Sequence, residues 1–191
     1  MPLEQVVLVA RESDHTNILY NALAAKFPTH VIFEEPPARW KLIRWRVRRS
    51  GWLRVVGQLM FHALVAVPLQ CSSSKRRAAI VASAGCSTAP PPPSRASRTP
   101  SVNSRDCRAQ IEALRPLVVV INGTRILTRE TLTAFRIPVL NVHAGITPKY
   151  RGVHGAYWAL ANKDREHCGV TVHLVDEGVD TGGILHQALI Q

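Results

Sequence analysis

Residues 6–33 read VVLVARESDHTNILYNALAAKFPTHVIF, and this stretch decides the fold class. Val6 to Ala10 are an apolar, β-branched run, which is typical of a strand buried on both faces of a parallel sheet. A helix is predicted over Asn17 to Lys26, since Pro28 ends it. Candidate caps for its start are Ser13, Asp14 and Thr16. His30 to Phe33 supply a second strand, so this β-α-β unit predicts an α/β fold with a doubly wound, mostly parallel sheet.

The same alternation resumes in the second half of the chain. Helices are predicted over Ala109–Leu114, Thr128–Phe135 and Gly152–Asn162, and strands over Leu117–Ile121, Pro138–Val142, Gly169–Val175 and Gly182–Ile190. A chain of 191 residues with 46% hydrophobic residues is enough for one domain with a real core. We therefore expect residues 1–191 to form a single catalytic domain of this α/β type.

The region from Arg39 to Arg108 interrupts the alternation and carries the charge of the chain. It holds 14 Lys/Arg and one acid, whereas the rest of the chain has 10 basic and 12 acidic residues. Residues 39–70 mix three tryptophans with arginines before turning apolar, which predicts a basic amphipathic helical insertion, broken near Gly51. Residues 71–108 are rich in Ser, Ala, Pro and Arg, and Pro90 to Pro93 exclude helix. They predict an irregular low-complexity connection over the surface.

The insertion fits three uses: packing on the domain, binding an anionic partner such as RNA, or binding a membrane surface. Its apolar run, Val55 to Leu69, is shorter than the ~20 residues that a spanning helix needs, so no transmembrane segment is expected. No basic stretch precedes the first apolar run, which argues against a signal peptide. The four cysteines form no C-x-x-C pair, so reduced thiols and a cytoplasmic location are expected.

Polar residues of three chemical types follow two predicted strands. In LNVHAGITPKYRG (140–152), Asn141 and His143 lie two apart and so share one side of a strand, at its carboxyl end. VDEGVDTGG (175–183) offers Asp176, Glu177 and Asp180 on a glycine-containing loop after another strand. An amide, an imidazole and a carboxylate suit acyl transfer to an amine: Asn141 can donate to the oxyanion, a protonated His143 can donate or relay a proton, and Asp180 can orient His143 and favour its charged form.

The segments VVINGTRIL (119–127), LNVHAGITPKYRG and CGVTVHLVDEGVDTGGILHQA (168–188) together resemble the folate-dependent formyltransferases, a family with glycinamide ribonucleotide and methionyl-tRNA branches. The resemblance implies formyl transfer from 10-formyltetrahydrofolate to a primary amine through a tetrahedral intermediate, without a metal. The family's Asn-x-His falls on Asn141 and His143, and its catalytic Asp on Asp180. The implied folate-binding residues are Arg125, Ile126, Leu127, Val175, Asp176, Glu177 and Gly178. The implied acceptor-binding residues are Asn17, Tyr150, Arg151 and Gly152.

The amine acceptor stays open among glycinamide ribonucleotide, methionyl-tRNA and a nucleotide-linked amino sugar. A small-molecule amine is the favoured partner, and tRNA is the alternative. The turn ARESDHTNIL (10–19) lacks the glycine-rich phosphate cradle of the ribonucleotide branch, and Glu12 and Asp14 would repel a phosphate. Only 11 residues follow Asp180, so the C-terminal part of the family's domain is expected to be missing.

Two other classes of function compete with the enzyme. An inactive, formyltransferase-like domain could act as an RNA- or membrane-surface-binding module through its basic helix. A metal hydrolase could use His143, His154 and His173 with Asp180. No tight ligand spacing such as H-E-x-x-H is present, so no metal is expected.

Overall fold

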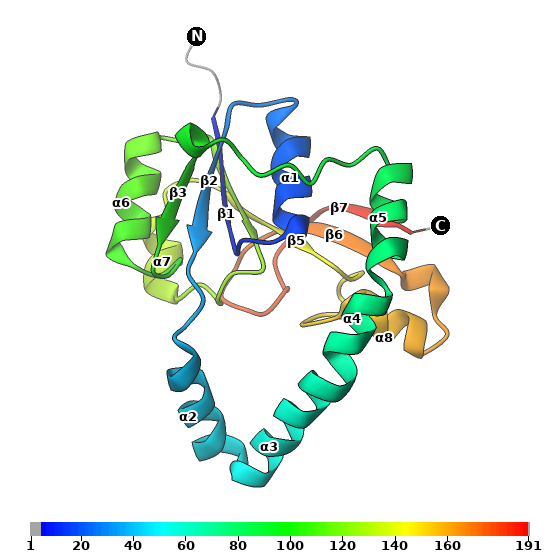
Figure 1. The fold of residues 1–191 in the computed structure, drawn as a ribbon. Helices are drawn as coiled ribbons and strands as arrows, with labels where there is room; N and C mark the ends of the chain where they lie inside the picture. Colours follow the sequence, from blue (N-terminus) through cyan, green and yellow to red (C-terminus); the bar gives the residue numbers. More distant parts are fainter. Residues whose placement is uncertain (1–4, 191) are drawn as a thin grey trace. The chain divides into compact units, whose positions relative to one another are not determined.

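The structure is a computed structural model that describes residues 5–190 and divides into two compact units (Figure 1). Unit 1 joins the chain up to Glu35 with the chain from Ala89 onward, and unit 2 is Pro36–Thr88. The strands of unit 1 are β1 Val6–Ala10, β2 Thr29–Glu34, β3 Ala96–Thr99, β4 Val118–Asn122, β5 Val139–His143, β6 Gly169–Leu174 and β7 Ile184–Leu189. Its helices are α1 Asp14–Ala24, α6 Arg105–Leu114, α7 Arg129–Ala134 and α8 Gly155–Ala161, with 3₁₀ turns at Pro93–Arg95 and Arg165–His167.

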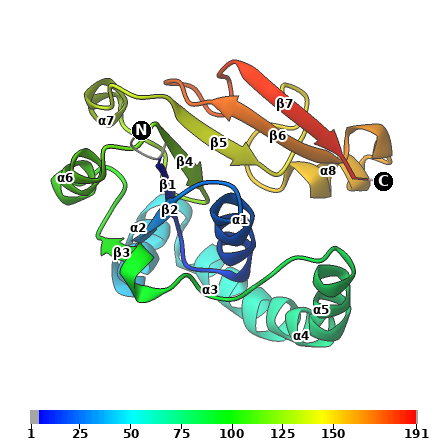
Figure 2. The same ribbon diagram turned by 90° about the horizontal axis from the view of Figure 1, so that it is seen from above.

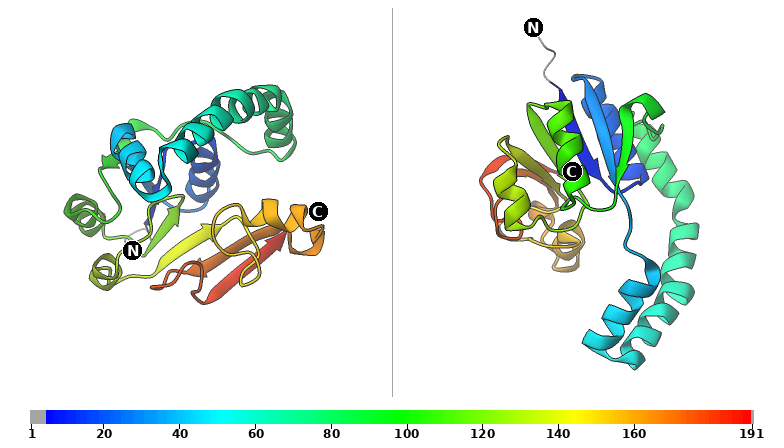
Figure 3. Two further views of the ribbon diagram at one scale, coloured as in Figure 1. Left: turned by 90° about the horizontal axis from the view of Figure 1, so that it is seen from below. Right: turned by 90° about the vertical axis from the view of Figure 1, so that its left-hand side faces the viewer.

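The seven strands form one sheet in the order β3-β2-β1-β4-β5-β6-β7. The first five are parallel, while β6 and β7 pair antiparallel at the far end (Figure 3). The prediction of a doubly wound, mostly parallel sheet is confirmed. Strand order reverses between β1 and β4, and such a reversal opens a crevice at the carboxyl ends of the strands.

The alternation of β1 explains the two layers of helices. Val7 and Val9 belong to a core cluster completed by residues of α6 and α7, whereas Val6 and Leu8 belong to a second cluster with Tyr20 of α1. Successive side chains of a strand point to opposite faces, so a strand covered on both faces needs a continuous apolar run. Figure 2 shows α1 on one side of the first strands and α6 and α7 on the other.

The expectation of an irregular connection over residues 71–108 is wrong over most of its length. The structure places α5, Ser74–Ser83, the strand β3 and the start of α6 within this range. α5 contains Ala, Lys and Arg, which favour helix, and β3 forms because it pairs with β2 from Val31 to Glu34. Residues 86–92, which include three of the four consecutive prolines, have no regular structure, as expected.

Unit 2 is entirely helical apart from its ends. Its elements are α2 Arg39–Ser50, α3 Trp52–Phe61, a π-helical turn His62–Ala66, α4 Val67–Ser72 and α5. Gly51, with φ +80°, separates α2 from α3, which confirms the predicted break. From Trp52 to Ser72 the chain is one continuous helix of 21 residues, long and apolar enough to cross a membrane by length and composition. The expectation that this segment is too short is therefore wrong, because the helix extends beyond the apolar run at both ends.

Candidate active site

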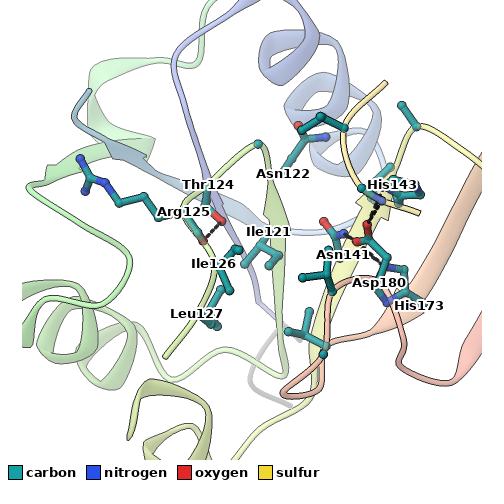
Figure 4. A pocket seen from close by; sticks show the side chains of 18 of the residues that line it. Ile121, Asn122, Thr124, Arg125, Ile126, Leu127, Asn141, His143, His173 and Asp180 are labelled. Carbon is teal, nitrogen blue, oxygen red and sulfur yellow. Dashed lines mark hydrogen bonds and ion pairs between the residues drawn. The ribbon is translucent and has the colours of Figure 1, made fainter. Parts of the chain in front are cut away.

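A cavity of about 400 Å³ opens at the carboxyl ends of β4 and β5. Three segments surround it: the end of β4 with residues 123–127, the end of β5 with residues 152–154, and the loop that follows β6. Figure 4 shows Asn141, His143, His173 and Asp180 gathered at one side of this cavity. The structure thus brings together the three residues that the sequence marks as catalytic, and it adds a second histidine.

Asp180 is the centre of the polar cluster. Its Oδ1 accepts a hydrogen bond from the Asn141 side-chain amide at 3.1 Å, and its Oδ2 accepts one from the Gly152 backbone N–H at 2.8 Å. Nitrogens of His143 and His173 each lie 3.4 Å from one of the two carboxylate oxygens. Because a carboxylate only accepts, the nitrogen end of the Asn141 amide must face it, which settles the orientation of this side chain.

His143 is held by both of its ring nitrogens. Its Nε2 lies 2.8 Å from the carbonyl oxygen of Tyr150, and its Nδ1 faces the carboxylate of Asp180. A carbonyl cannot donate, so Nε2 carries a hydrogen. A charged imidazolium ring, with a hydrogen on each nitrogen, satisfies both neighbours at once.

The position of His143 depends on a glycine two residues along the chain. A Cβ atom at Gly145 would lie 2.7 Å from His143 Nε2 and 2.5 Å from the Tyr150 carbonyl oxygen. Real Cβ atoms essentially never approach that closely, so only glycine permits the imidazole to reach this carbonyl. The glycine after the strand is thus a packing requirement of the site.

His173 is the residue that sequence reasoning missed. The sequence offers it only as a candidate metal ligand, whereas in the structure it is buried and its Nε2 lies 3.2 Å from the Asn141 amide nitrogen. Its Nδ1 donates to the Leu174 carbonyl oxygen, which leaves Nε2 to accept from Asn141. β5 and β6 pair antiparallel with Asn141 directly opposite His173, so the two side chains share one face of the sheet. The antiparallel register between β5 and β6 is the signal that would have identified His173 as a member of the site.

The loop Gly123–Leu127 forms one wall of the cavity, but the side chain of Arg125 turns away from the polar cluster around Asp180 (Figure 4). Its guanidinium donates to the buried carboxylate of Glu34 at 3.2 Å and to the carbonyl oxygens of Pro100 and Glu35. Its backbone N–H also donates to Glu34, at 2.9 Å. Arg125 thus fixes the loop to β2, and its neighbours Ile126 and Leu127 line the cavity.

The loop after β6 is organised by Asp176. Its Oδ1 accepts from the Gly178 backbone N–H and from the Thr181 hydroxyl, at 3.0 and 2.6 Å. Among the predicted folate-binding residues, Val175, Asp176 and Gly178 line the cavity. Glu177 does not, because its carboxylate pairs with Arg129 on α7 at 2.9 Å.

Of the predicted acceptor-binding residues, the structure brings one to the cavity. Gly152 lines it and donates to Asp180. Tyr150 is buried, and its hydroxyl donates to Asp164 at 2.8 Å, so its side chain serves the packing of the turn before α8. Asn17 and Arg151 lie outside the lining, the former on α1 and the latter exposed in the loop after Tyr150.

The turn that leads into α1 contains no glycine, and side chains of the turn and of the first helical residues cap the amino end of the helix. The Ser13 hydroxyl accepts from the Thr16 backbone N–H at 3.2 Å, and the Thr16 hydroxyl donates to the Arg11 carbonyl oxygen at 2.5 Å. Asp14 lies in the first turn, and Glu12 pairs with Arg98 at 2.7 Å. The turn therefore offers a carboxylate and an occupied N–H where a phosphate-binding turn would offer bare N–H groups.

A second network joins the turn before α8 to the turn after it. The Asp164 carboxylate lies 2.6 Å from Lys149 Nζ, 2.7 Å from His167 Nδ1 and 2.8 Å from the Tyr150 hydroxyl. The hydrogen bonds from Lys149, His167 and Tyr150 hold the pKa of this carboxyl far below its ordinary value. The same carboxylate raises the pKa of Lys149. This network fixes the side chain of Tyr150, the residue whose carbonyl oxygen contacts His143 Nε2.

The family model described as formyl transferase matches residues 3–191. A methionyl-tRNA formyltransferase from Methylacidiphilum infernorum is 43% identical over 86 residues, which is 44% of this chain and 27% of that protein. The crystal structure of glycinamide ribonucleotide transformylase 1 from Symbiobacterium toebii covers 97% of this chain and 72% of its own, at a TM-score of 0.56 and 21% identity. A sugar N-formyltransferase from a Shewanella species covers 98% and 57%, at a TM-score of 0.54 and 16% identity. The alignment with the curated relative thus spans about a quarter of its length, and the structural likenesses show the shared fold.

Proposed function

Because the chain belongs to the formyl transferase family, we propose that it transfers a formyl group from 10-formyltetrahydrofolate to a primary amine. The observation that carries the proposal is the Asp180 carboxylate, which lies between an amide and two imidazoles at the edge of an open cavity. This set can move a proton and stabilise charge on an oxygen, and those are the two needs of acyl transfer to nitrogen.

The cavity fits the folate in size and in the character of its walls. About 400 Å³ lies within the range of small-molecule sites, ~300–1,000 Å³. Ile121, Leu127 and Val175 supply apolar walls, and residues of two loops, 123–127 and 175–180, line the rest. We propose that the 123–127 loop and the loop after β6 hold the pterin ring, and that the folate supplies the electrophilic formyl carbon.

Transfer forms one bond and breaks another. The acceptor nitrogen bonds to the formyl carbon, the bond from that carbon to N10 of the folate breaks, and one proton passes from the acceptor nitrogen to N10. No redox change occurs, and no co-reactant is consumed.

Asn141 is proposed to stabilise the carbonyl oxygen as negative charge develops on it. The amide nitrogen has two hydrogens, and in this structure it contacts Asp180 and the His173 imidazole. An oxygen that enters the cavity competes with His173 Nε2 for one of them. The hydrogen bond to Asp180 remains and keeps the amide aimed at the cavity.

Asp180 and His143 are proposed to handle the proton. The Asp180 carboxylate can accept the proton that the acceptor nitrogen loses, since it is only partly exposed and already oriented by Asn141 and Gly152. A charged His143 next to it stabilises the anionic carboxylate and adds positive charge beside the reacting carbonyl. Orientation by the Tyr150 carbonyl keeps the imidazole in place through the reaction.

A panel of amines tests the proposal and identifies the acceptor. The purified chain is mixed with 10-formyltetrahydrofolate and, in separate reactions, with glycinamide ribonucleotide, methionyl-tRNA or a nucleotide-linked amino sugar. Release of tetrahydrofolate and the mass of the formylated product are recorded. We expect a small amine or an aminoacyl group to be formylated, in a reaction that runs in the cytoplasm. Folded protein that formylates none of these amines would contradict the proposal.

A further inference from the structure

Unit 2 carries a concentrated positive charge that the proposed reaction does not use. Residues 36–88 contain ten Lys/Arg and no Asp or Glu. Seven of the ten lie before Val55, and the other three are Lys75, Arg76 and Arg77 at the start of α5. Between these two groups, residues 55–74 carry no Lys, Arg, Asp or Glu. A basic segment on each side of an apolar one matches a partner with an anionic surface and an apolar interior.

The apolar helix of unit 2 leaves its large side chains exposed. Only 6% of the most apolar window of the helix Trp52–Ser72 is buried. Leu53, Phe61 and Leu64 are each more than 60% exposed. A contiguous apolar face of this length is rare on the surface of a protein that is alone in water, so it marks an interaction site.

The first turns of the helix are two-sided. Arg54, Gln58 and His62 recur every four residues and so form one polar stripe, whereas Val56 and Met60 lie roughly opposite it at 100° per residue. Trp45 and Trp52 are exposed near the basic end, and the Arg49 guanidinium stacks over the Trp45 ring at 5.4 Å from its centroid. Tryptophan and arginine are the side chains that favour the boundary between lipid headgroups and hydrocarbon.

The topology of the sheet decides how a bilayer can be contacted. β2 precedes unit 2 and β3 follows it, and the two strands pair with each other in one sheet. Both ends of unit 2 must therefore lie on the same side of any bilayer, which excludes an odd number of crossings. A return crossing has no candidate among the described residues: α5 has 10 residues, about 15 Å, and the 12-residue α2 holds six basic ones.

We propose that unit 2 binds the surface of an anionic lipid bilayer, with the helix Trp52–Ser72 lying in the plane of the interface. Its apolar side enters the boundary of the acyl chains, and its polar stripe faces the headgroups and water. The basic residues of α2 and of the start of α5 contact anionic headgroups at the two ends. The formyl transfer site would then operate next to a membrane.

Vesicle flotation with the full chain tests the binding. Vesicles of phosphatidylcholine with a third phosphatidylglycerol should carry the protein upward, and vesicles of pure phosphatidylcholine should carry far less. Changing Lys75, Arg76 and Arg77 to Gln should weaken binding to the anionic vesicles on the order of a hundredfold, since each basic residue near such a surface contributes ~1 kcal/mol. Equal binding to both kinds of vesicle, or to neither, would overturn the proposal.

A matched pair of double variants separates membrane insertion from simple charge attraction. Val56→Glu with Met60→Glu places two carboxylates on the apolar side, and Gln58→Glu with His62→Glu places two on the polar stripe of the same turns. We expect the first pair to weaken binding more than ~tenfold relative to the second, because a charge is costly in the acyl region. Equal loss in both pairs would show that charge alone acts. The thermal midpoint of unfolding checks that each variant is folded.

Thiol labelling reports whether the helix lies in the plane. Cys71 and Cys86 are exposed, whereas Cys107 and Cys168 are buried. Burial raises the pKa of Cys107 to about 12, so this thiol does not compete for reagent at neutral pH. In a variant with Cys71→Ser and Cys86→Ser, Gln58→Cys places a thiol on the polar stripe. Added to sealed vesicles, a membrane-impermeant maleimide should label this position from outside as completely as in detergent. Protection of position 58 would mean that the helix crosses, and vesicle-independent dimers lost in Val56→Glu with Met60→Glu would mean that a second copy covers the face. Either result would overturn the proposal.

Discussion

At the scale of single residues, the candidate site depends on groups that hold one another in place. Asp180 adopts a left-handed backbone conformation, φ +51°, which is unusual for a residue other than glycine. That conformation is sustained by the Gly152 N–H and the Asn141 amide on the two carboxylate oxygens. A strained residue with such partners is typical of a functional position.

His143→Ala and Asp180→Ala should each lower turnover ~10²–10³-fold, which is the usual effect of removing one preorganised group from such a site. Steady-state kinetics with the accepted amine measure the effect. Glu112→Ala is the control, because this exposed carboxylate lies on α6 and outside the lining of the cavity. The control should stay within a few-fold of the parent. Turnover of either site variant at that same level would refute the catalytic roles.

Gly145→Ala should displace His143 and lower turnover while the protein stays folded. Its Cβ would lie 2.7 Å from the imidazole, and such overpacking costs ~1–3 kcal/mol. Gly57→Ala is the comparison, since nothing lies within 4 Å of its Cβ position and Ala favours helix by ~0.5–1 kcal/mol over Gly. The midpoint of thermal unfolding should be lower for Gly145→Ala than for the parent, and it should not be lowered for Gly57→Ala. Normal turnover in Gly145→Ala would show that the site tolerates a moved His143.

At the scale of elements, two carboxylates hold the loops and turns around the site in place. Glu34, buried at the end of β2, accepts from Arg125 and from the Val102 backbone N–H, and so ties two loops to one strand. Asp164 ties the turn before α8 to the turn after it. Each of these carboxylates organises backbone that has no ladder partner of its own.

Asp164→Asn should make the dependence of stability on acid shallower. Hydrogen bonds from Lys149, His167 and Tyr150 hold the pKa of Asp164 below its ordinary value of 3.8 in the folded state. A lowered pKa stabilises the fold above the unfolded value, and this contribution is lost as the pH falls below it. The difference in thermal midpoint between parent and variant should be full at pH 5–7 and shrink as pH drops below about 4. A difference that does not change with pH would contradict the ion-pair assignment.

The amino end of α1 predicts that free glycinamide ribonucleotide is a poor substrate. Ser13 already occupies a backbone N–H, Asp14 adds a negative charge, and no glycine allows close approach of a phosphate. We expect a kcat/KM well below ~10⁴ M⁻¹s⁻¹, the lower end of the ordinary enzyme range. Replacing Asp14 with Asn should raise it. A kcat/KM in the ordinary range for the parent would contradict this prediction and support glycinamide ribonucleotide as the acceptor.

At the scale of the whole molecule, one continuous chain builds two units of different character. The apolar strands and the polar cluster belong to unit 1. Among the described residues of unit 2, Val55 is the buried large hydrophobic residue. The connection back to unit 1 runs through the prolines, where Asn21 of α1 donates to the Ala89 carbonyl oxygen at 2.9 Å. The sheet does not require unit 2 to be intact, because β2 and β3 pair directly.

Limited trypsin digestion should therefore cut unit 2 first and leave the two halves of unit 1 together. Ten basic residues lie in unit 2, and Arg44, Arg76 and Arg77 are exposed. The fragments should migrate as one species in size-exclusion chromatography and separate only in denaturant, because their strands share the sheet. Mass spectrometry locates the cuts. First cleavage within β4 or β5 would contradict this division of the molecule.

Much of unit 1 and of its site could be predicted from the sequence because the signals there are local. Apolar runs such as Val6–Ala10 match β1. The helix predicted from Thr128 is α7, and the Thr128 hydroxyl caps it by accepting from the Thr131 backbone N–H. Asn141 and His143 share a face of β5 because of the two-residue period of a strand. β3 was missed because its four residues carry no apolar pattern and form a strand only beside β2.

The sequence by itself determined the α/β class, the succession of β1, α1 and β2, the break at Gly51, and the face of β5 that Asn141 and His143 share, since each follows from spacing along the chain. Asp180 was singled out by the resemblance to the family. Only the tertiary structure decided that His173 joins them, because the antiparallel register of β6 on β5 sets that contact. It also decided that the side chains of Arg125 and Tyr150 donate to Glu34 and Asp164, away from the polar cluster around Asp180. Contacts between residues far apart in the chain depend on register and loop closure, and no local pattern encodes them.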